Sequence, residues 1–227
     1  MVIPLASRKL QLGISLVEIL ISSLIGVITL GIVGSLFFAS LKISGYRGER
    51  LLLVDSLENT MLQIKQDIKL AGYNGDLGVV AKLEGSLNTV YVSSDNRALG
   101  YVYQLPSTEE TEYRNVYFKY QAALSAQGGQ LKLCEKQTTQ PLDISLAAQS
   151  GPLGHCYNLF DPGLISIASF EVTTETIHGQ KSARQLVSIR LVGYLKNAPE
   201  IHHSSEIKIL IRNNSETAAR FGNINRI

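Results

Sequence analysis

The chain has 227 residues, of which 45% are hydrophobic, and a formal net charge of +2 from 21 Lys and Arg against 19 Asp and Glu. This length fits one globular domain plus an additional element and is too short for two full domains. Arg8 and Lys9 are the only charged residues before Gly13. The remainder of the sequence therefore has 21 − 2 = 19 Lys and Arg against 19 Asp and Glu, a net charge of zero. Nucleic-acid binding needs clustered cations, and this balance excludes that class.

The segment from Ile14 to Leu41 is apolar along its whole length, with no Pro and one charged residue, Glu18. At about 1.5 Å per residue, a helix of this length spans about 40 Å, enough to cross a hydrocarbon core of about 30 Å. A secretory signal peptide has an apolar stretch of only about 7–15 residues, and a helix that is apolar on every side does not suit a soluble surface. The segment is therefore predicted to span a membrane.

Glu18 requires an explanation, because a carboxylate in a hydrocarbon span costs roughly 2.5–3.5 kcal/mol on insertion scales. Either it lies near the end of the span and reaches the lipid headgroups, or it meets a positive partner during assembly. Its position alone favours the first explanation.

The charges that flank the span leave its orientation open. Arg8 and Lys9 precede it and favour a cytoplasmic N-terminus, but Lys42, Arg47 and Arg50 follow it closely. A disulfide in the C-terminal half would favour an exported domain, because a bacterial periplasm permits such bonds.

The amphipathic pattern of a second helical part follows the span. Apolar residues recur at spacings of three and four, which predicts one buried face. They are Val54, Leu57, Met61, Ile64, Ile68 and Ala71. Gly72 supplies a helix stop, and Gly45 and Gly48 are placed to soften the junction with the apolar part.

Strand patterns begin after Gly78. Strands are predicted at Thr89–Ser93, Leu99–Gln104, Asn115–Gln121, Leu131–Glu135, Ile165–Thr174, Gln185–Leu195 and Glu206–Arg212. A hairpin turn is predicted at Gln127–Gln130, and no regular element is predicted in Gln137–Leu164. Because no helical pattern separates the strands, we expect an α+β fold in which one antiparallel sheet packs against the helical stripe.

Two cysteines, Cys134 and Cys156, lie in the C-terminal half. They cannot complete a tetrahedral zinc site, which takes four ligands, and the neighbouring His155 adds at most a third. We expect a disulfide between them if this half lies in an oxidising compartment. Two free buried thiols are the alternative.

The basic pair Arg8-Lys9, then Gly13, Ile14 and an apolar run that contains Glu18 form a recognisable N-terminal pattern. It resembles the class III leader of type IV pilins and of the pseudopilins of type II secretion. The resemblance implies that an inner-membrane prepilin peptidase cuts between Gly13 and Ile14, that Ile14 is then N-methylated, and that Glu18 acts in subunit assembly. Ile14 stands where most members have Phe. The Pro usual in the span of major pilins is also absent, and this second departure points to a minor subunit or a pseudopilin.

The segment Gln66–Tyr73 is similar to the helix end of minor pilins of the PilW kind, which include the prepilin peptidase-dependent protein B group. The late cysteine pair and the closing strand with Ile211-Arg212-Asn213 look similar too. The resemblance implies five parts, which are a leader (1–13), a transmembrane or filament-core helix (14–41), an amphipathic helix (42–72), a periplasmic sheet domain (73–213) and a polar tail (214–227).

The resemblance implies a minor pilin that helps to initiate or cap a type IV pilus. Its partners would be prepilin peptidase, other minor and major pilins or pseudopilins, and an inner-membrane assembly platform. It would be a single-pass inner-membrane protein with a periplasmic C-terminal domain before it enters the pilus or pseudopilus. A minor pseudopilin of the J type is the close alternative, and an uncleaved single-pass periplasmic anchor or adaptor is the alternative from another class.

No catalytic pattern is found in the sequence. His202 and His203 are adjacent, so a strand would place them on opposite faces rather than at one metal. The glycines after position 71 lack the Lys-Ser/Thr of a nucleotide-binding loop, and no Ser lies in a nucleophile elbow. We expect no enzymatic activity, no cofactor and no metal site.

Overall fold

The computed structural model describes residues 15–75, 79–106, 112–122, 128–178 and 183–213. The chain divides into two compact units, Met1–Gly48 and Glu49–Ile227, and each is described by itself. The helix α1 (Leu16–Asp67) contributes residues to both units and continues without a break through Gly45 and Gly48, where a softened junction was expected.

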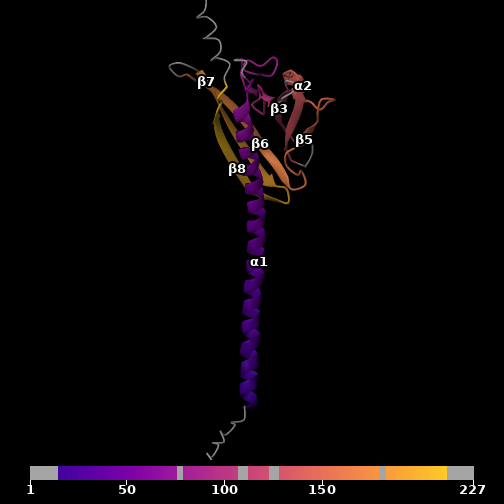
Figure 1. The fold of residues 1–227 in the computed structure, drawn as a ribbon. Helices are drawn as coiled ribbons and strands as arrows, with labels where there is room; N and C mark the ends of the chain where they lie inside the picture. The colour runs from indigo at the N-terminus through magenta and orange to yellow at the C-terminus, as the bar shows by residue number, and fades with distance from the viewer. Residues whose placement is uncertain (1–14, 76–78, 107–111, 123–127, 179–182, 214–227) are drawn as a thin grey trace, which may run out of the picture. The chain divides into compact units, whose positions relative to one another are not determined.

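In the first unit, α1 is a single continuous helix (Figure 1). Its side chains there are mostly apolar and exposed. Its length and composition are sufficient for a helix that crosses a membrane. Ser and Thr hydroxyls along it donate to carbonyl oxygens about one turn earlier, from Ser23 to Leu20, Thr29 to Ile25, Ser35 to Ile32 and Ser40 to Leu36. Because these hydroxyl protons are bonded within the helix, the segment is compatible with the predicted single-pass membrane anchor.

In the second unit, the end of α1 and the short 3₁₀ helix η1 (Ile68–Leu70) bury one stripe of side chains. The stripe consists of Leu53, Leu57, Met61, Ile64, Ile68 and Ala71, each at most 1% exposed. The prediction was wrong by one residue at its start, because Leu53, and not the partly buried Val54, lies one helical turn before Leu57 on the buried face.

The helical segment ends with η1 at Leu70, two residues before Gly72, where the sequence predicts a helix stop. Gly72 has a φ of +80°, and a Cβ there would lie 2.5 Å from Thr89 Cγ2 and 2.9 Å from the carbonyl oxygen of Asn213. A larger residue would therefore be both strained and obstructed. The Gly72 N–H donates to the Val102 carbonyl, which ties the helix end to the neighbouring strand.

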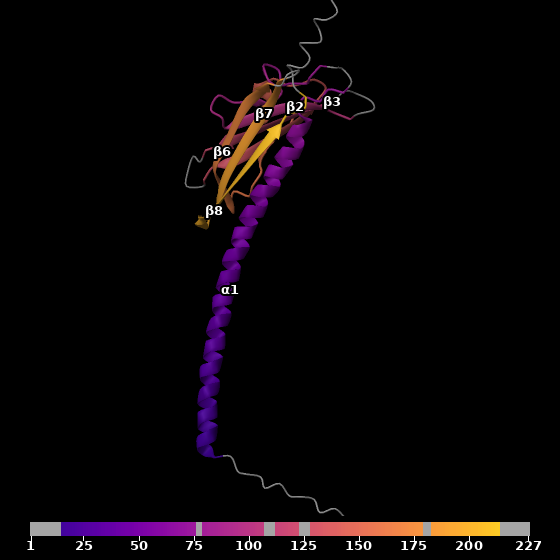
Figure 2. The same ribbon diagram turned by 90° about the vertical axis from the view of Figure 1, so that its left-hand side faces the viewer.

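The predicted α+β fold with antiparallel strands packed on the helix is confirmed, but the strands form two sheets and not one. The first has the order β1 (Tyr91–Val92), β2 (Ala98–Leu105), β3 (Glu112–Gln121), β4 (Gln130–Thr138) and β5 (Cys156–Asn158). The second has the order β6 (Ile165–His178), β7 (Ala183–Leu195) and β8 (Ala198–Leu210), which lie side by side in Figure 2. Alternation within a strand indicates its buried face but not its neighbours, and the division was therefore invisible in the sequence.

Each predicted strand overlaps an observed one, but the bounds differ most at β8. This strand begins at Ala198 instead of Glu206, because its first half lacks a regular apolar alternation. β5 and the short helix α2 (Ile144–Ala147) lie where no regular element was predicted. Residues 123–127, which include the start of the predicted hairpin turn, lie outside the described residues, as does the predicted tail from position 214. β3 and β4, on either side of that turn, pair antiparallel.

The helical stripe and both sheets of the second unit share one hydrophobic core. Leu99 and Tyr101 of β2 join it from the first sheet, and Val187 and Leu191 of β7 join it from the second. The helix comes very close to β7, since a Cβ on Gly193 would lie 3.2 Å from the methyl groups of Leu57.

The disulfide between Cys134 and Cys156 joins β4 to β5, where the two residues are direct cross-strand neighbours. Two lysines hold the loop between these strands. Lys136 Nζ donates to the carbonyls of Leu146 and Gln149, and Lys119 Nζ donates to that of Ala148 at 2.6 Å. The carbonyl groups at the C-terminal end of α2 lack partners within the helix, and positively charged donors there also interact favourably with the helix dipole.

We expect the disulfide to stabilise the second unit by about 3 kcal/mol, because it closes a loop with a sequence separation of 22. Reduction should lower the Tm by about 6–12 °C, as measured by thermal unfolding of the full chain in detergent. A Cys134→Ser/Cys156→Ser double variant is the control, and its Tm should not respond to reductant. An equal Tm for oxidised and reduced wild-type protein would show that the bond adds no stability.

Candidate functional site

The first candidate site is the apolar surface of α1 within residues 16–48. Every large apolar side chain in it is between 50% and 74% exposed, from Tyr46 at the lower limit to Leu16 at the upper. A continuous apolar surface of this size is not stable in water and requires lipid or other protein around it.

Glu18 lies in the first turn of this helix and is the only charged residue of the sequence between positions 10 and 41. Its backbone N–H donates to the Ser15 carbonyl at 3.0 Å. A carboxylate at the N-terminal end of a helix is favoured by the helix dipole. Gly13 and Ile14, the residues of the predicted cleavage site, lie outside the described residues.

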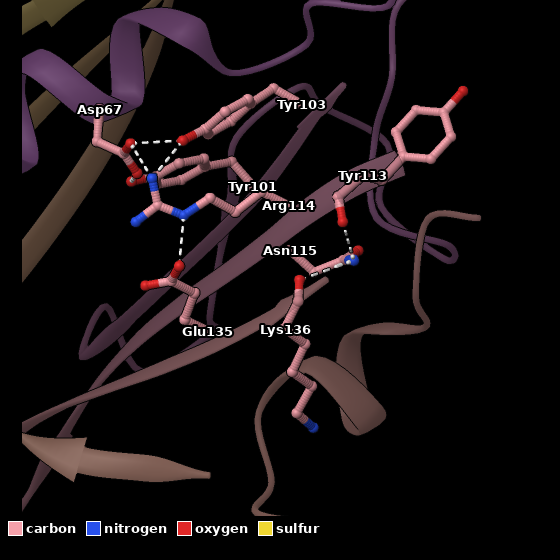
Figure 3. Close-up of polar contacts among 8 residues, drawn as sticks. All are labelled: Asp67, Tyr101, Tyr103, Tyr113, Arg114, Asn115, Glu135 and Lys136. Carbon is pink, nitrogen blue, oxygen red and sulfur yellow. Dashed lines mark hydrogen bonds and ion pairs between the residues drawn. The ribbon is translucent and has the colours of Figure 1, made fainter. Parts of the chain in front are cut away.

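A second site, in the second unit, surrounds Asp67 at the C-terminal end of α1 (Figure 3). Its carboxylate accepts hydrogen bonds from Tyr101 Oη at 2.6 Å, Tyr103 Oη at 2.7 Å and Arg114 Nη1 at 3.0 Å. Arg114 Nε in turn lies 2.8 Å from Glu135 Oε1. A network that runs from the helix through β2 and β3 to β4 therefore holds these elements together.

The electrostatics of this network favour the protonation states that its bonds require. Burial, together with the Asp67 carboxylate, raises the pKa of Tyr101 well above its usual value and also raises the pKa of Tyr103. Burial disfavours the charge on Arg114, but the Glu135 hydrogen bond and the Asp67 charge outweigh this effect and raise the pKa of Arg114. The phenols therefore remain donors at neutral pH and the guanidinium remains charged.

A groove with a volume of about 460 Å³ opens beside this network, between α1 and the first sheet. Its floor is apolar, with Val116, Phe118 and Leu133, and Arg114 and Glu135 lie at its polar end. It can accept an apolar group at the floor and hydrogen bonds at the polar end, and its lining contains no pair of nucleophile and base.

Asn115 organises the neighbouring loop. Its Nδ2 donates to Thr138 Oγ1 at 2.8 Å, and its Oδ1 accepts from the Leu142 N–H at 2.8 Å. Figure 3 shows it on β3 next to Arg114, with its amide facing away from the Asp67 network. Neither the Asp67 network nor the bonds of Asn115 are predicted from the sequence.

His202 and His203 have different partners, as their adjacent positions in a strand predict. His203 Nε2 lies 2.9 Å from Glu58 Oε1 on the helix, whereas His202 Nδ1 lies near the Glu200 carbonyl. Within the part of the chain that the structure describes, no group of three His, Cys, Asp or Glu side chains is placed to hold a metal ion. Glu18 and the Cys134–Cys156 pair belong to different units.

The exposed membrane-length helix and the α+β domain built on its continuation define a pilin-related protein. The family model described as prepilin peptidase-dependent protein B matches residues 48–211, and the chain belongs to this family. The match covers nearly the whole second unit and leaves out the apolar part of α1. Comparisons with curated proteins and with solved structures give no significant match.

We predict that Asp67→Asn destabilises the second unit by about 3 kcal/mol, because the amide cannot accept three donors and leaves the Arg114 charge without its partner. The Tm should fall by about 6–12 °C, as measured by thermal unfolding of the full chain in detergent. Asp55→Asn, on an exposed position of the same helix, is the matched control and should change the Tm by less than about 2 °C. Equal stability of the two variants would show that the network contributes little.

Proposed function

We propose that the protein is a minor pilin that helps to initiate or cap a type IV pilus after a prepilin peptidase cuts between Gly13 and Ile14. The main support is a single observation. The helix α1, whose large apolar side chains within residues 16–48 are at least half exposed and whose first turn carries one acid, continues into a domain of a prepilin peptidase-dependent family. Such a helix needs a lipid or protein environment that this chain alone does not supply.

Before assembly, the helix anchors the subunit in the inner membrane by a single pass, and the second unit lies in the periplasm. The Cys134–Cys156 disulfide supports this orientation, because such bonds persist in oxidising compartments. The proposed parts are those predicted from the sequence, with a leader at 1–13 and a filament-core helix at 14–41.

Cleavage creates a new α-amine on Ile14, only four residues from Glu18. Inside an assembly, the Glu18 carboxylate of one subunit pairs with the α-amine of a neighbour in an apolar environment. Attraction between opposite charges is far stronger there than in water and offsets the cost of desolvating both groups. A subunit added out of register leaves Glu18 unpaired and is penalised, so the pair selects the correct position.

The partners in this proposal are the peptidase, other minor and major pilins, and an inner-membrane assembly platform. A minor pseudopilin of the J type in type II secretion uses the same helix in the same way and is the alternative within this class. The family to which the chain belongs is pilin-related, and neither role requires an enzymatic activity or a cofactor.

Intact mass spectrometry tests the cleavage. The full chain is expressed with an active prepilin peptidase and with an inactive one. We expect the loss of residues 1–13 and the gain of one methyl group on Ile14 with the active enzyme. A Gly13→Leu variant is the control and should stay uncut, because a side chain there obstructs the approach of the peptidase. An uncut wild-type chain beside an active peptidase would instead support an uncleaved single-pass anchor.

We predict that Glu18→Gln inserts into the membrane and is cleaved normally, yet enters pilin assemblies at least 10-fold less well. The amide keeps the size of the side chain but removes the charge that pairs with the neighbouring amine. Co-purification with tagged pilins measures incorporation, and Ser22→Ala, at an exposed position one turn along the same helix, is the control. Equal recovery of both variants would contradict the proposed role of Glu18.

A further inference from the structure

The edges of the two sheets differ in how well they are covered. In the first sheet, both edge strands are very short, since β1 has 2 residues and β5 has 3. In the second sheet, β6 is bonded on its outer side to segments beside the first sheet, with Ile167 N–H to the carbonyl of Gly129, just before β4, and Val172 N–H to the carbonyl of Asn96, between β1 and β2. β8, with 13 residues, is a long strand on the opposite edge.

The hydrogen-bond register shows which backbone groups of β8 face outward. The Ile211 N–H donates to the Gln185 carbonyl, and the pairing of β8 with β7 continues in this register to His202. In an antiparallel pair, only alternate residues bond to the partner strand. The odd-numbered residues therefore bond to β7, and the outward groups belong to His202, Ser204, Glu206, Lys208 and Leu210. No described residue supplies a backbone partner for these five.

The side chains of these outward residues are all exposed. Glu206 and Lys208 are 53% and 65% exposed, and their charged atoms are 3.9 Å apart. An ion pair with this exposure and distance contributes little to stability. Both charges thus remain available to opposite charges on an added strand, and they disfavour a strand that carries the same charges at the facing positions.

An apolar part of the helix adjoins this open edge. Glu58 accepts bonds from Ser205 Oγ at 3.0 Å and lies 2.9 Å from His203 Nε2, so the Glu58 side of α1 lies under β8. Leu62, one turn further on that side, is 50% exposed. A strand added beside β8 would bring its inward side chains toward Leu62 and toward Ile207, which is only partly buried.

We propose that β8 is an assembly surface to which another pilin-type subunit adds an extended segment as a fourth strand of the second sheet. The segment alternates apolar residues, which face Leu62 and Ile207, with polar ones. It carries a basic residue opposite Glu206 and an acidic residue opposite Lys208. Backbone hydrogen bonds provide the affinity of such strand addition, and the alternating side chains provide its specificity. This inference rests on the proposed function.

Hydrogen exchange of the full chain in detergent tests whether the edge is open. We expect the amides of Ser204, Glu206 and Lys208 to exchange rapidly, and those of Ser205 and Ile207 to be protected by β7. In complexes with tagged pilins of the same assembly, exchange of the outward amides should slow at least 10-fold. Outward amides that are already protected in the isolated chain, or that stay unprotected in the complex, would overturn the proposal.

Ser204→Pro tests whether the edge is used. Proline removes the outward N–H of Ser204 without removing a bond to β7, so the Tm should stay close to that of the control Ser204→Thr, which keeps the N–H. Recovery of the Pro variant with tagged pilins should fall at least 10-fold relative to the Thr variant. If both variants are recovered equally, the strand-addition surface is refuted while the pilin function stands. If even the wild-type chain is not recovered, the proposed function fails and this inference fails with it.

Discussion

The burial of one helical stripe against two sheets is the constraint on which the second unit depends. Side chains of both sheets join one core with the buried stripe of α1, in which Leu57 and Met61 are fully buried. Complete burial of such a side chain contributes about 1.5–3 kcal/mol. Two positions near the stripe require glycine. Gly193 leaves room for Leu57, and Gly72 adopts a positive φ where the chain turns after the stripe. The two sheets hold their relative places because they share the helix and because β6 is bonded to Gly129 and Asn96 beside the first sheet.

Hydrophobic contact alone does not fix the rotation of α1 about its axis against the sheets. The hydrogen bonds of the Asp67 network do. An acid near the C-terminal end of a helix is disfavoured by the helix dipole, so Asp67 must be compensated by its surroundings. Tyr101, Tyr103 and Arg114 donate to it from two strands, and these bonds have strict distance and angle requirements. Rotation of the helix by a fraction of a turn would preserve apolar contact but would break these bonds. The network therefore selects one arrangement among several with similar hydrophobic burial.

The local elements could be predicted from the sequence because each depends on a short repeat. The apolar span, the stripe that ends at Ala71 and the strands follow from spacings within a few residues, and the family resemblance came from Gly13, Glu18 and the helix end. The division into two sheets, the first half of β8 and the strand β5 depend on pairing between distant segments, for which local alternation carries no information. Part of the Asp67 network was visible in principle, since Tyr101 and Tyr103 share one face of a strand by their spacing of two. Their acidic partner on a distant helix was not.

The two parts of α1 differ in where their apolar side chains can be buried. The part after Gly48 has one apolar face and is satisfied by its own sheets, whereas the part before it is apolar all round and buries no side chain within the chain. Lipid tails are as apolar as leucine, so hydrophobic burial alone does not favour a bundle of helices over the bilayer. If this helix leaves the lipid for a filament, as proposed, the free-energy difference between the two environments must come from groups that lipid and protein solvate differently. The hydroxyls of Ser23, Thr29, Ser35 and Ser40 are bonded within the helix and satisfied in either environment, whereas the charge of Glu18 is a group whose solvation differs between lipid and protein. Under the proposed function, the Glu18 carboxylate would control assembly, and it lies outside the unit whose core determines the stability of the fold.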